Sequence, residues 1–170
     1  MNISIRDASV ADAKRLAEIY AYYVENTAVS FEYVPPSAEE FGHRIAGILE
    51  KYPYLVCERD GEIIGYAYAS AYSAREAYCR TAAASVYVDR AHRREGAGTL
   101  LYAALEERLR SQGIVNLLAG VAYSVEEDEH LSHDSKNFHI AMGFEQAAHL
   151  KGIGIKFGKW YDLLWFQKRI

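Results

Sequence analysis

The sequence contains few cysteines, few prolines and no sign of a linker. Of its 170 residues, two are cysteine and three are proline. Cys57 and Cys79 have no CxxC partner, so neither a zinc ribbon nor a disulfide framework is expected, and we predict buried or unreactive thiols. Internal repeats and low-complexity tracts are also missing. A single domain over residues 1–170 is therefore the simplest expectation.

Long hydrophobic runs and an excess of positive charge are absent as well. No run of about 18 uncharged apolar residues occurs, so we expect no membrane span. The first residues, MNISIRDASVADAKRL, carry charges where a signal peptide has an apolar core, so we expect a cytoplasmic protein. A net charge of −4 argues against nucleic-acid binding, which needs a basic surface. What remains, with 51% apolar and 25% charged residues, is the composition of a globular domain.

Turn and capping signals divide the first half of the chain. Residues 3–8 alternate between apolar and polar side chains and predict a strand. Ser9 and Ser37, each followed three residues later by an acidic residue, carry the capping-box pattern that begins a helix. Asp60-Gly61 lies between two β-rich runs and predicts a hairpin.

Strands and helices alternate in the second half. A strand ends at Val88, and Gly113 and Gly143 are the predicted C-terminal stops of two helices. The elements after Val88 are expected at 99–112 (helix), 115–123 (strand) and 132–142 (helix), followed by two closing strands. The order β-α-α-β-β-β-α-β-α-β-β predicts an α+β fold with a mixed central sheet and one βαβ unit at 85–121.

The most informative stretch is SVYVDRAHRREGAGTLL at 85–101, where a strand ends in a glycine-bearing turn and a helix follows. The first N–H groups of a helix are unpaired, and Gly96 and Gly98 let a ligand approach the main chain, so the turn is a candidate anion site. Neither GxxxxGK(S/T) nor GxGxxG is present, which excludes the common nucleotide loops and leaves a plain solvated turn as the alternative. Positive charge comes from three neighbouring arginines, Arg90, Arg93 and Arg94.

The pattern Arg93-x-x-Gly96-x-Gly98 resembles the acetyl-CoA pyrophosphate loop of the GNAT superfamily of N-acetyltransferases, Q/R-x-x-G-x-G/A. The predicted order of elements is also that of this superfamily. The resemblance implies the GNAT fold, a mixed central sheet of about seven strands flanked by about four helices. Four further segments are similar to the phosphinothricin acetyltransferase subfamily: TAVSF at 27–31, DGEIIGYAYAS at 60–70, AREAYCRTAAASVYV at 74–88, and GIGIKFGKWYD at 152–162 followed by Gln167.

The resemblance implies transfer of an acetyl group from acetyl-CoA to the primary amine of a small molecule, by direct attack on the thioester. It implies as acceptor an amino acid or a toxic analogue of the phosphinothricin or methionine sulfone type. Backbone N–H groups of 86–88 would hold the pantetheine arm and polarise the carbonyl, and those of 96–99 the pyrophosphate. The cofactor-binding residues so predicted are Val86, Tyr87, Val88, Arg93, Arg94, Glu95, Gly96, Ala97, Gly98, Thr99 and Ser135.

The glutamate that related enzymes use to deprotonate the amine is missing, because the sequence has Ala83 where it is expected, two residues after Thr81. A positioned base contributes about 10²–10⁴-fold, less than proximity can, so its loss is compatible with activity. The candidate catalytic residues are Glu32 and His139 as substitute bases. His139 is also a candidate acid for the thiolate, with a histidine packed between helix and sheet as the alternative.

The acceptor pocket is predicted from the same resemblance. An arginine of the AR-x-AY segment would pair with a substrate carboxylate, although a solvated hairpin end fits that segment equally. Ser132 departs from the family, which often has asparagine there, so that cofactor contact is in doubt. The predicted substrate-binding residues are Phe31, Glu32, Arg75, Tyr78, Arg80 and Thr81.

Three further features leave alternatives open. The acidic run at 126–129 is either a solvated loop or a cover over the acceptor site that favours cationic amines. His130-x-x-His133 has weak spacing for zinc and the reaction needs no metal, so we predict no metal site. The tail KWYDLLWFQK has apolar residues on both faces, which, with the resemblance, favours a homodimer.

Two other functions stay open at this point. Ala83 is compatible with an acyl-CoA-binding pseudoenzyme, and the acidic loop with a protein or peptide N-acetyltransferase that uses it for docking. Turnover would distinguish a small-molecule enzyme from the pseudoenzyme. The size of the accepted amine would distinguish it from a protein or peptide N-acetyltransferase.

Overall fold

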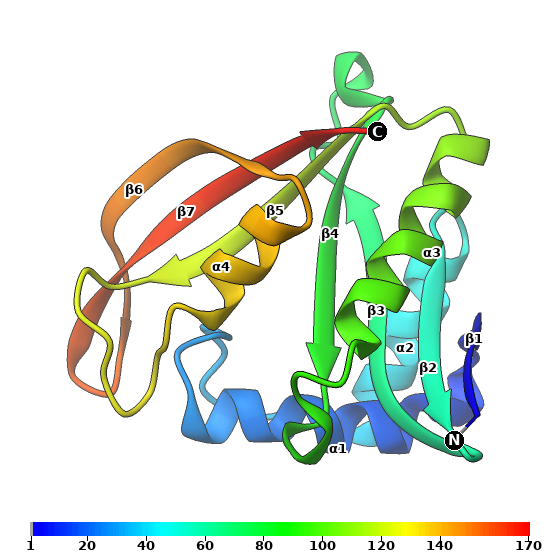
Figure 1. Cartoon of the computed structure of the whole chain (residues 1–170), viewed down its shortest axis with the longest axis horizontal. Helices are drawn as coiled ribbons and strands as arrows, with labels where there is room; N and C mark the ends of the chain where they lie inside the picture. Colours follow the sequence, from blue (N-terminus) through cyan, green and yellow to red (C-terminus); the bar gives the residue numbers. More distant parts are fainter. Residues whose placement is uncertain (1) are drawn as a thin grey trace.

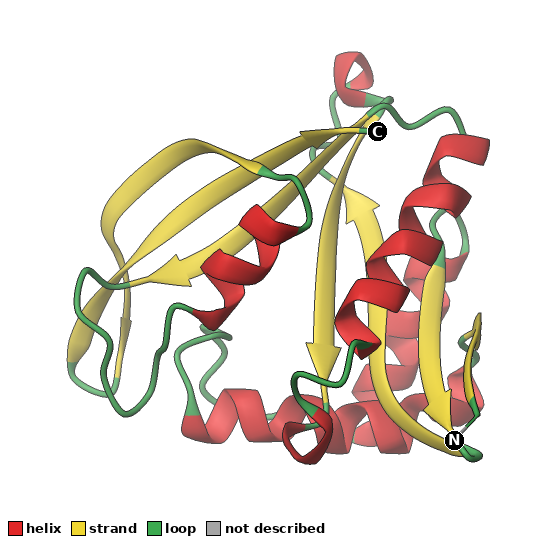
Figure 2. Cartoon of the chain, viewed as in Figure 1, coloured by secondary structure: helices red, strands yellow, loops and turns green. Residues whose placement is uncertain are grey.

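The computed structural model describes residues 2–170 as a seven-stranded mixed sheet with helices on both faces (Figures 1 and 2). The helices are α1 (Ala13–Asn26), α2 (Ala38–Leu49), α3 (Ala97–Ser111) and α4 (Asp134–Ala141). The strands are β1 (Ile3–Asp7), β2 (Tyr54–Arg59), β3 (Glu62–Ala71), β4 (Thr81–Val88), β5 (Asn116–Tyr123), β6 (Glu145–Lys156) and β7 (Lys159–Arg169). Both the α+β class and the order of elements are as the sequence predicts.

The sheet divides between β4 and β5, which are its only parallel neighbours among the described strands. Its order is β1-β2-β3-β4-β5-β7-β6. The parallel pairing covers only Thr81–Ala83 of β4 and Asn116–Leu118 of β5, although β4 continues to Val88 and β5 to Tyr123. Figure 1 shows β5, β7 and β6 turning away from β4 beyond this point. One edge of the β4 backbone is therefore left free of a neighbouring strand where the two halves separate.

Local signals account for most element boundaries. Ser37 Oγ accepts a hydrogen bond from the backbone N–H of Glu40 at 3.1 Å and starts α2. The capping box of Ser9 starts a short 3₁₀ turn directly before α1. Gly96, with φ of 89°, occupies the N-cap position of α3, so this helix begins two residues earlier than predicted. The helix α4 is shorter than predicted, covering 134–141 instead of 132–142.

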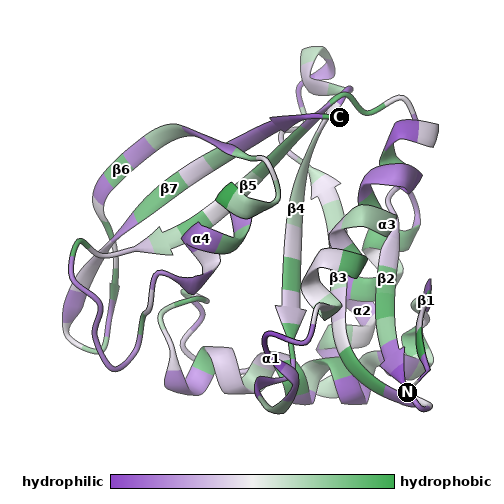
Figure 3. Ribbon diagram, in the orientation of Figure 1, coloured by the Kyte–Doolittle hydropathy of each residue, from purple (hydrophilic) through white to green (hydrophobic). Residues whose placement is uncertain are grey.

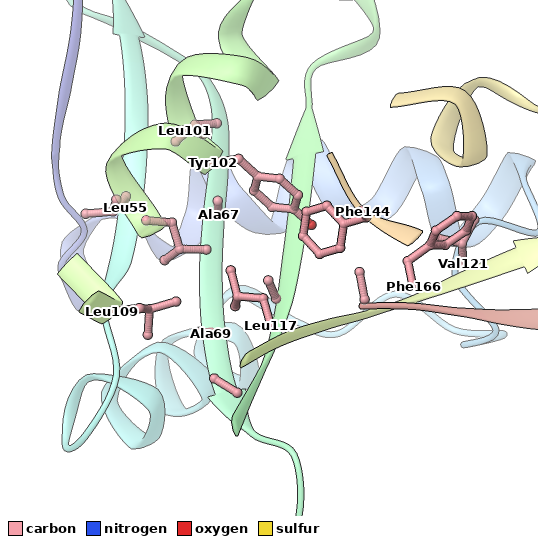
Figure 4. Packing of buried hydrophobic residues seen from close by; sticks show 14 of the residues in the cluster. Leu55, Ala67, Ala69, Leu101, Tyr102, Leu109, Leu117, Val121, Phe144 and Phe166 are labelled. Atoms are coloured by element: carbon pink, nitrogen blue, oxygen red, sulfur yellow. The ribbon is translucent and has the colours of Figure 1, made fainter. Parts of the chain in front are cut away.

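Two hydrophobic cores pack on opposite faces of the sheet. On one face Leu101, Leu105 and Leu109 of α3 are fully buried against β2, β3 and β4 (Figure 4). On the other, α1 and α2 cover Tyr54 and Tyr66. Figure 3 shows hydrophilic residues along the turn before α3 and the loop before α4. Cys57 is buried, Cys79 is exposed and both are free thiols. No helix within residues 2–170 combines the length and the apolar character that crossing a membrane requires.

Candidate active site

A groove of about 440 Å³ runs along β4, the N-terminus of α3 and α4. It contains nine of the eleven residues that the sequence predicts for the cofactor: Val86, Val88, Arg93, Arg94, Gly96, Ala97, Gly98, Thr99 and Ser135. Because the loop and the strand are adjacent in sequence, a local motif is enough to build most of this wall.

The glycines of the loop bring the main chain to the surface of the groove. Gly96 has a left-handed backbone, and a Cβ added there would meet no atom within 4 Å, so its face is open toward the groove. A Cβ on Gly98 would lie 3.3 Å from the Phe138 ring of α4, so a larger residue there would require the ring to shift. The unpaired N–H groups at the start of α3 are therefore accessible from the groove to an anion such as a pyrophosphate.

Arginines and polar groups complete the groove. The Arg93 guanidinium lies 5.3 Å from the centre of the Tyr23 ring, and the Tyr23 hydroxyl donates to the carbonyl of Val88. Arg94 crosses the groove to pair with Asp134 at 3.2 Å. Asn137 and Ser132 also line the groove, and no sequence signal had marked Asn137.

Two of the predicted cofactor residues lie elsewhere. Glu95 does not line the groove, and its carboxylate pairs with Arg59 and with His92. Tyr87 is on the opposite face of β4 from Val86 and Val88, because successive strand residues alternate, and it faces a second depression.

This second depression, which we call the acceptor basin, has a volume of about 420 Å³. Phe31 and Glu32 lie in it, as predicted. Its walls come from α1, the loop after it, β4, β5 and β7, and comprise Tyr20, Val29, Ser30, Phe31, Glu32, Tyr87, Gly120, Ala122 and Leu163. A Cβ on Gly154 would lie 2.5 Å from the Phe31 ring, so the lack of a side chain at this residue of β6 lets the ring pack against the backbone.

Glu32 is held as a carboxylate in the basin. Arg44 of α2 donates to both of its oxygens, at 3.0 and 2.8 Å, and the Tyr20 hydroxyl donates to one of them. The hydrogen bonds from Arg44 lower the pKa of Glu32, against the opposing effect of burial. A carboxylate with a lowered pKa is a weak base, so the arrangement suits attraction of a cationic amine better than removal of its proton.

Lys156 fixes the loop that carries these residues. Its ammonium is buried and donates to the carbonyls of Val24, Thr27 and Ser30 at 2.6, 2.8 and 2.7 Å. The Val24 carbonyl belongs to the last turn of α1 and the other two follow the end of the helix, where helical partners run out. The lysine of the GxKxGxW motif therefore ties the acceptor loop to β6.

A small cavity of about 50 Å³ beside β4 and β5 borders both depressions; we call it the junction. It shares Val86 and Ser135 with the groove, and Tyr87 and Gly120 with the basin. A thioester whose CoA part lies in the groove would place its acetyl end here, within reach of an amine entering from the basin.

His139 lines the junction and is 4% exposed. Its Nδ1 lies 2.7 Å from the Ser135 carbonyl, and its Nε2 lies 2.9 Å from the Tyr102 hydroxyl. Burial lowers the pKa of His139, so the imidazole is neutral at pH 7. Ala83 sits on β4 opposite Ser70 and brings no carboxylate to this region.

The remaining predicted substrate residues lie at the far end of the β3–β4 hairpin. Arg75, Tyr78, Arg80 and Thr81 line neither the groove, the basin nor the junction among the described residues. Tyr78 contacts Tyr72, with ring centres 5.2 Å apart, and Tyr72 contacts Trp165 at 6.0 Å. An aromatic chain thus links this hairpin to Gly120 in the basin wall, since Trp165 lies 3.5 Å from a Cβ placed there.

The acidic loop is anchored to the strand β7. Asp128 accepts hydrogen bonds from Lys159 and Tyr161, and, although burial acts in the opposite direction, the Lys159 contact and other hydrogen bonds lower its pKa to about 2. The residues that line the basin within the described chain do not include the acids at 126–129. His130 and His133 bind different backbone carbonyls, and residues 2–170 contain no cluster of three or more metal-ligating side chains.

Comparison with known proteins extends these observations. A profile of the acetyltransferase (GNAT) domain matches residues 5–165. The phosphinothricin N-acetyltransferase of Alcaligenes faecalis is 39% identical, covering 92% of this chain and 77% of that protein. The L-methionine sulfoximine/L-methionine sulfone acetyltransferase of Pseudomonas paraeruginosa is 34% identical over 98% of this chain and 94% of that protein.

A solved structure agrees along the whole chain. The phosphinothricin acetyltransferase of Sinorhizobium meliloti, crystallised with acetyl-CoA, superposes with a TM-score of 0.90 and 33% identity, covering 100% of this chain and 89% of that one. The sheet that divides at β4, the glycine loop at the head of α3 and these similarities point the same way. The resemblance predicted from the sequence is confirmed: the chain belongs to the GNAT family of acetyltransferases and is an N-acetyltransferase that uses acetyl-CoA.

Proposed function

We propose that the protein acetylates the α-amine of a small amino acid or of a toxic amino-acid analogue of the phosphinothricin or methionine sulfone type. The observation that carries this proposal is the junction, where a cofactor groove meets a basin of about 420 Å³ that holds an ionised Glu32. The activities for which the similar proteins are named support the acceptor class.

Different residues bind the cofactor, polarise the thioester and bind the amine. The N–H groups of 96–99 bind the pyrophosphate, and those of β4 at the split hold the pantetheine arm and polarise the thioester carbonyl. Glu32 draws the amine into the basin. Holding the amine nitrogen against the thioester carbon supplies about 7–11 kcal/mol of the barrier reduction.

The missing base at Ala83 favours a weakly basic acceptor. An α-amino group, with a pKa near 8, is about one-tenth neutral at pH 7, whereas a lysine amine near 10.4 is below about one part in a thousand. Because Glu32 is a weak base, the amine loses its first proton to solvent. An α-amine does so more readily than a lysine amine, since its pKa is lower. This argues for amino acids over lysine side chains and polyamines.

We infer further that the protein works as a cytoplasmic homodimer. Exposed apolar side chains on the outer hairpin β6–β7 and the acceptor loop support a second copy as the partner: Val34, Ile153, Ile155 and Trp160 are 77%, 52%, 45% and 61% exposed. Light scattering should give a dimer for the wild type, and a shift toward monomer for Trp160→Glu; a monomeric wild type would end this inference.

The function is tested by thiol release from acetyl-CoA with methionine sulfone, phosphinothricin, polyamines and a lysine peptide, each from pH 6 to 9. The expected result is turnover with methionine sulfone and phosphinothricin. The rate should rise with pH as the α-ammonium group of the acceptor loses its proton. Preference for the peptide would favour a protein acetyltransferase. Binding of acetyl-CoA without turnover, unchanged in Ala83→Glu, would favour the pseudoenzyme.

A further inference from the structure

The turn that carries the glycine loop is held from outside the groove at both of its ends. Figure 1 shows this turn between β4 and α3, at the end of the sheet where β2 also ends. At its start, Arg15 of α1 donates to the Asp89 carboxylate at 2.6 Å. At its end, Arg59, the last residue of β2, pairs with Glu95, which directly precedes the N-cap residue Gly96. The first contact keeps the turn attached to the fold, so the second acts on the segment that leads into α3.

The segment around Glu95 has a backbone that needs support. Arg94 has a φ of 63° and Gly96 a φ of 89°, so two left-handed residues flank Glu95. This conformation costs glycine little but is unfavourable for arginine. A residue other than glycine keeps it only where the surrounding structure fixes it. Glu95, anchored through its side chain, is the fixed point between the two left-handed residues.

The Glu95 carboxylate is bound by two side chains. Arg59 Nη1 donates to its Oε2, and Nδ1 of His92 lies 3.2 Å from the same oxygen. The Arg59 side chain is 17% exposed, and its Nε is buried without a hydrogen-bond partner among the described residues. Arg59 is therefore placed for its contact with Glu95 and not for a full set of hydrogen bonds of its own. His92 lines the groove, whereas Arg59 and Glu95 stand behind it.

The position of Glu95 determines how the first N–H groups of α3 are arranged. These groups belong to residues 96–99, which follow Glu95 directly. Without the contact to Arg59, Arg94 is free to leave its left-handed conformation, and the segment from 93 to 96 then samples other conformations. Binding of the pyrophosphate would have to restore the order of this segment, and that ordering lowers the affinity.

We propose that Arg59 and Glu95 are positioning residues that hold the pyrophosphate loop in its binding geometry before acetyl-CoA arrives. Neither side chain touches the cofactor. The pair acts on the pyrophosphate part alone, because the N–H groups of 86–88 that hold the pantetheine arm precede the turn and belong to the sheet. The inference does not depend on which amine is the acceptor.

The affinity for acetyl-CoA tests the pair in Glu95→Gln, in Arg59→Met and in the double variant. We expect calorimetry to give a Kd about five- to tenfold higher in each single variant. The double variant should lie within about twofold of the singles, because two residues that act as one unit do not lose affinity additively. Glu58→Gln is the matched control, since Glu58 is the neighbouring residue of β2 and pairs with Arg6 at 2.7 Å, outside the groove. Its Kd should stay within about twofold of wild type.

S-acetylpantetheine, which lacks the pyrophosphate, separates a positioning role from a structural one. With methionine sulfone as acceptor, kcat/KM for acetyl-CoA should fall in Glu95→Gln as the Kd rises, while kcat/KM for S-acetylpantetheine stays within about twofold of wild type. Equal losses with both thioesters, additive losses in the double variant, or an unchanged affinity for acetyl-CoA would overturn the inference. If the wild type acetylates no amine, the proposed function fails, and the calorimetry still decides the role of the pair.

Discussion

The cofactor groove and the acceptor basin meet at one cavity but are built in opposite ways. The groove is made largely of residues close together in sequence, from 86–99 and 132–141, and includes the backbone of the glycine-bearing turn. The basin is made of side chains from both ends and the middle of the chain, such as Tyr20, Glu32 and Leu163. A backbone cradle tolerates change in the side chains around it, whereas a side-chain wall can be altered one residue at a time. We therefore expect the groove to bind the same cofactor despite changes in nearby side chains, and the basin to determine which acceptor is used.

The largest expected effect comes from breaking the backbone of the groove. Gly96 and Gly61 have nearly equal φ, 89° and 87°, and open space around a new Cβ, so Gly96→Val and Gly61→Val impose the same strain of about 1–3 kcal/mol. We expect Gly96→Val to weaken acetyl-CoA binding about 100-fold and the hairpin control Gly61→Val to leave it within twofold. Calorimetric titration measures this, and equal losses in both variants would count against the groove.

A change in the basin should be about tenfold and leave the groove untouched. Glu32→Gln removes the charge that attracts the amine, so kcat/KM for the acceptor should fall about 10-fold while acetyl-CoA affinity stays within twofold. Glu40→Gln is the control, because Glu40 also pairs with Arg44, at 3.2 Å, but lies outside the basin. Steady-state kinetics at varied acceptor concentration measure kcat/KM for both variants. A loss of acetyl-CoA affinity in Glu32→Gln would contradict the separation of cofactor binding in the groove from acceptor binding in the basin.

Burial of His139 at the junction should affect how the free energy of unfolding depends on pH. The pKa of His139 is lowered in the folded protein, so between the unfolded value near 6.5 and the folded pKa the unfolded chain binds more protons. The free energy of unfolding should therefore fall as pH drops below 6.5, by at most about 1.4 kcal/mol per pH unit for one proton. Urea titrations at pH 7 and 5.5 should show a smaller drop in His139→Gln; an identical drop would mean that His139 is charged when folded.

The smallest effect is expected at the exposed rim of the groove. Arg94 is 83% exposed, and its pair with Asp134 spans the groove at 3.2 Å. An exposed pair contributes about 0–1 kcal/mol, so Arg94→Gln should hardly change the melting temperature. It should weaken acetyl-CoA binding a few-fold at low salt and less at high salt, because exposed charges are screened. Loss that is independent of salt would point to a direct contact instead.

The same contrast explains what could be predicted from the sequence. The order of elements, the stops at Gly113 and Gly143 and the loop at 93–99 follow from local patterns, and the structure has positive φ at both glycines. The helix α3 begins two residues earlier than the predicted 99–112 because Gly96, with a left-handed backbone, occupies its N-cap position.

Residues that act across the fold gave no such signal. Arg44 looks in the sequence like any arginine on a helix surface, and only the packing of α2 against the acceptor loop brings it to Glu32. Tyr102 lies in an apolar stretch typical of a core helix, and its contact with His139 depends on how α4 crosses the sheet. Conversely, Arg75 and Tyr78 carry a family pattern but lie at the hairpin end, outside the basin.

The central claim is that groove and basin form one continuous site through the junction. It is tested most directly by the affinity of a bisubstrate compound, CoA joined through an acetyl bridge to the α-amine of methionine sulfone. Since binding of the second half becomes intramolecular, we expect calorimetry to show binding about 100-fold tighter than that of acetyl-CoA, with part of the gain lost in Glu32→Gln. An affinity no higher than that of acetyl-CoA would contradict the claim, because it would mean that the two depressions cannot be occupied together.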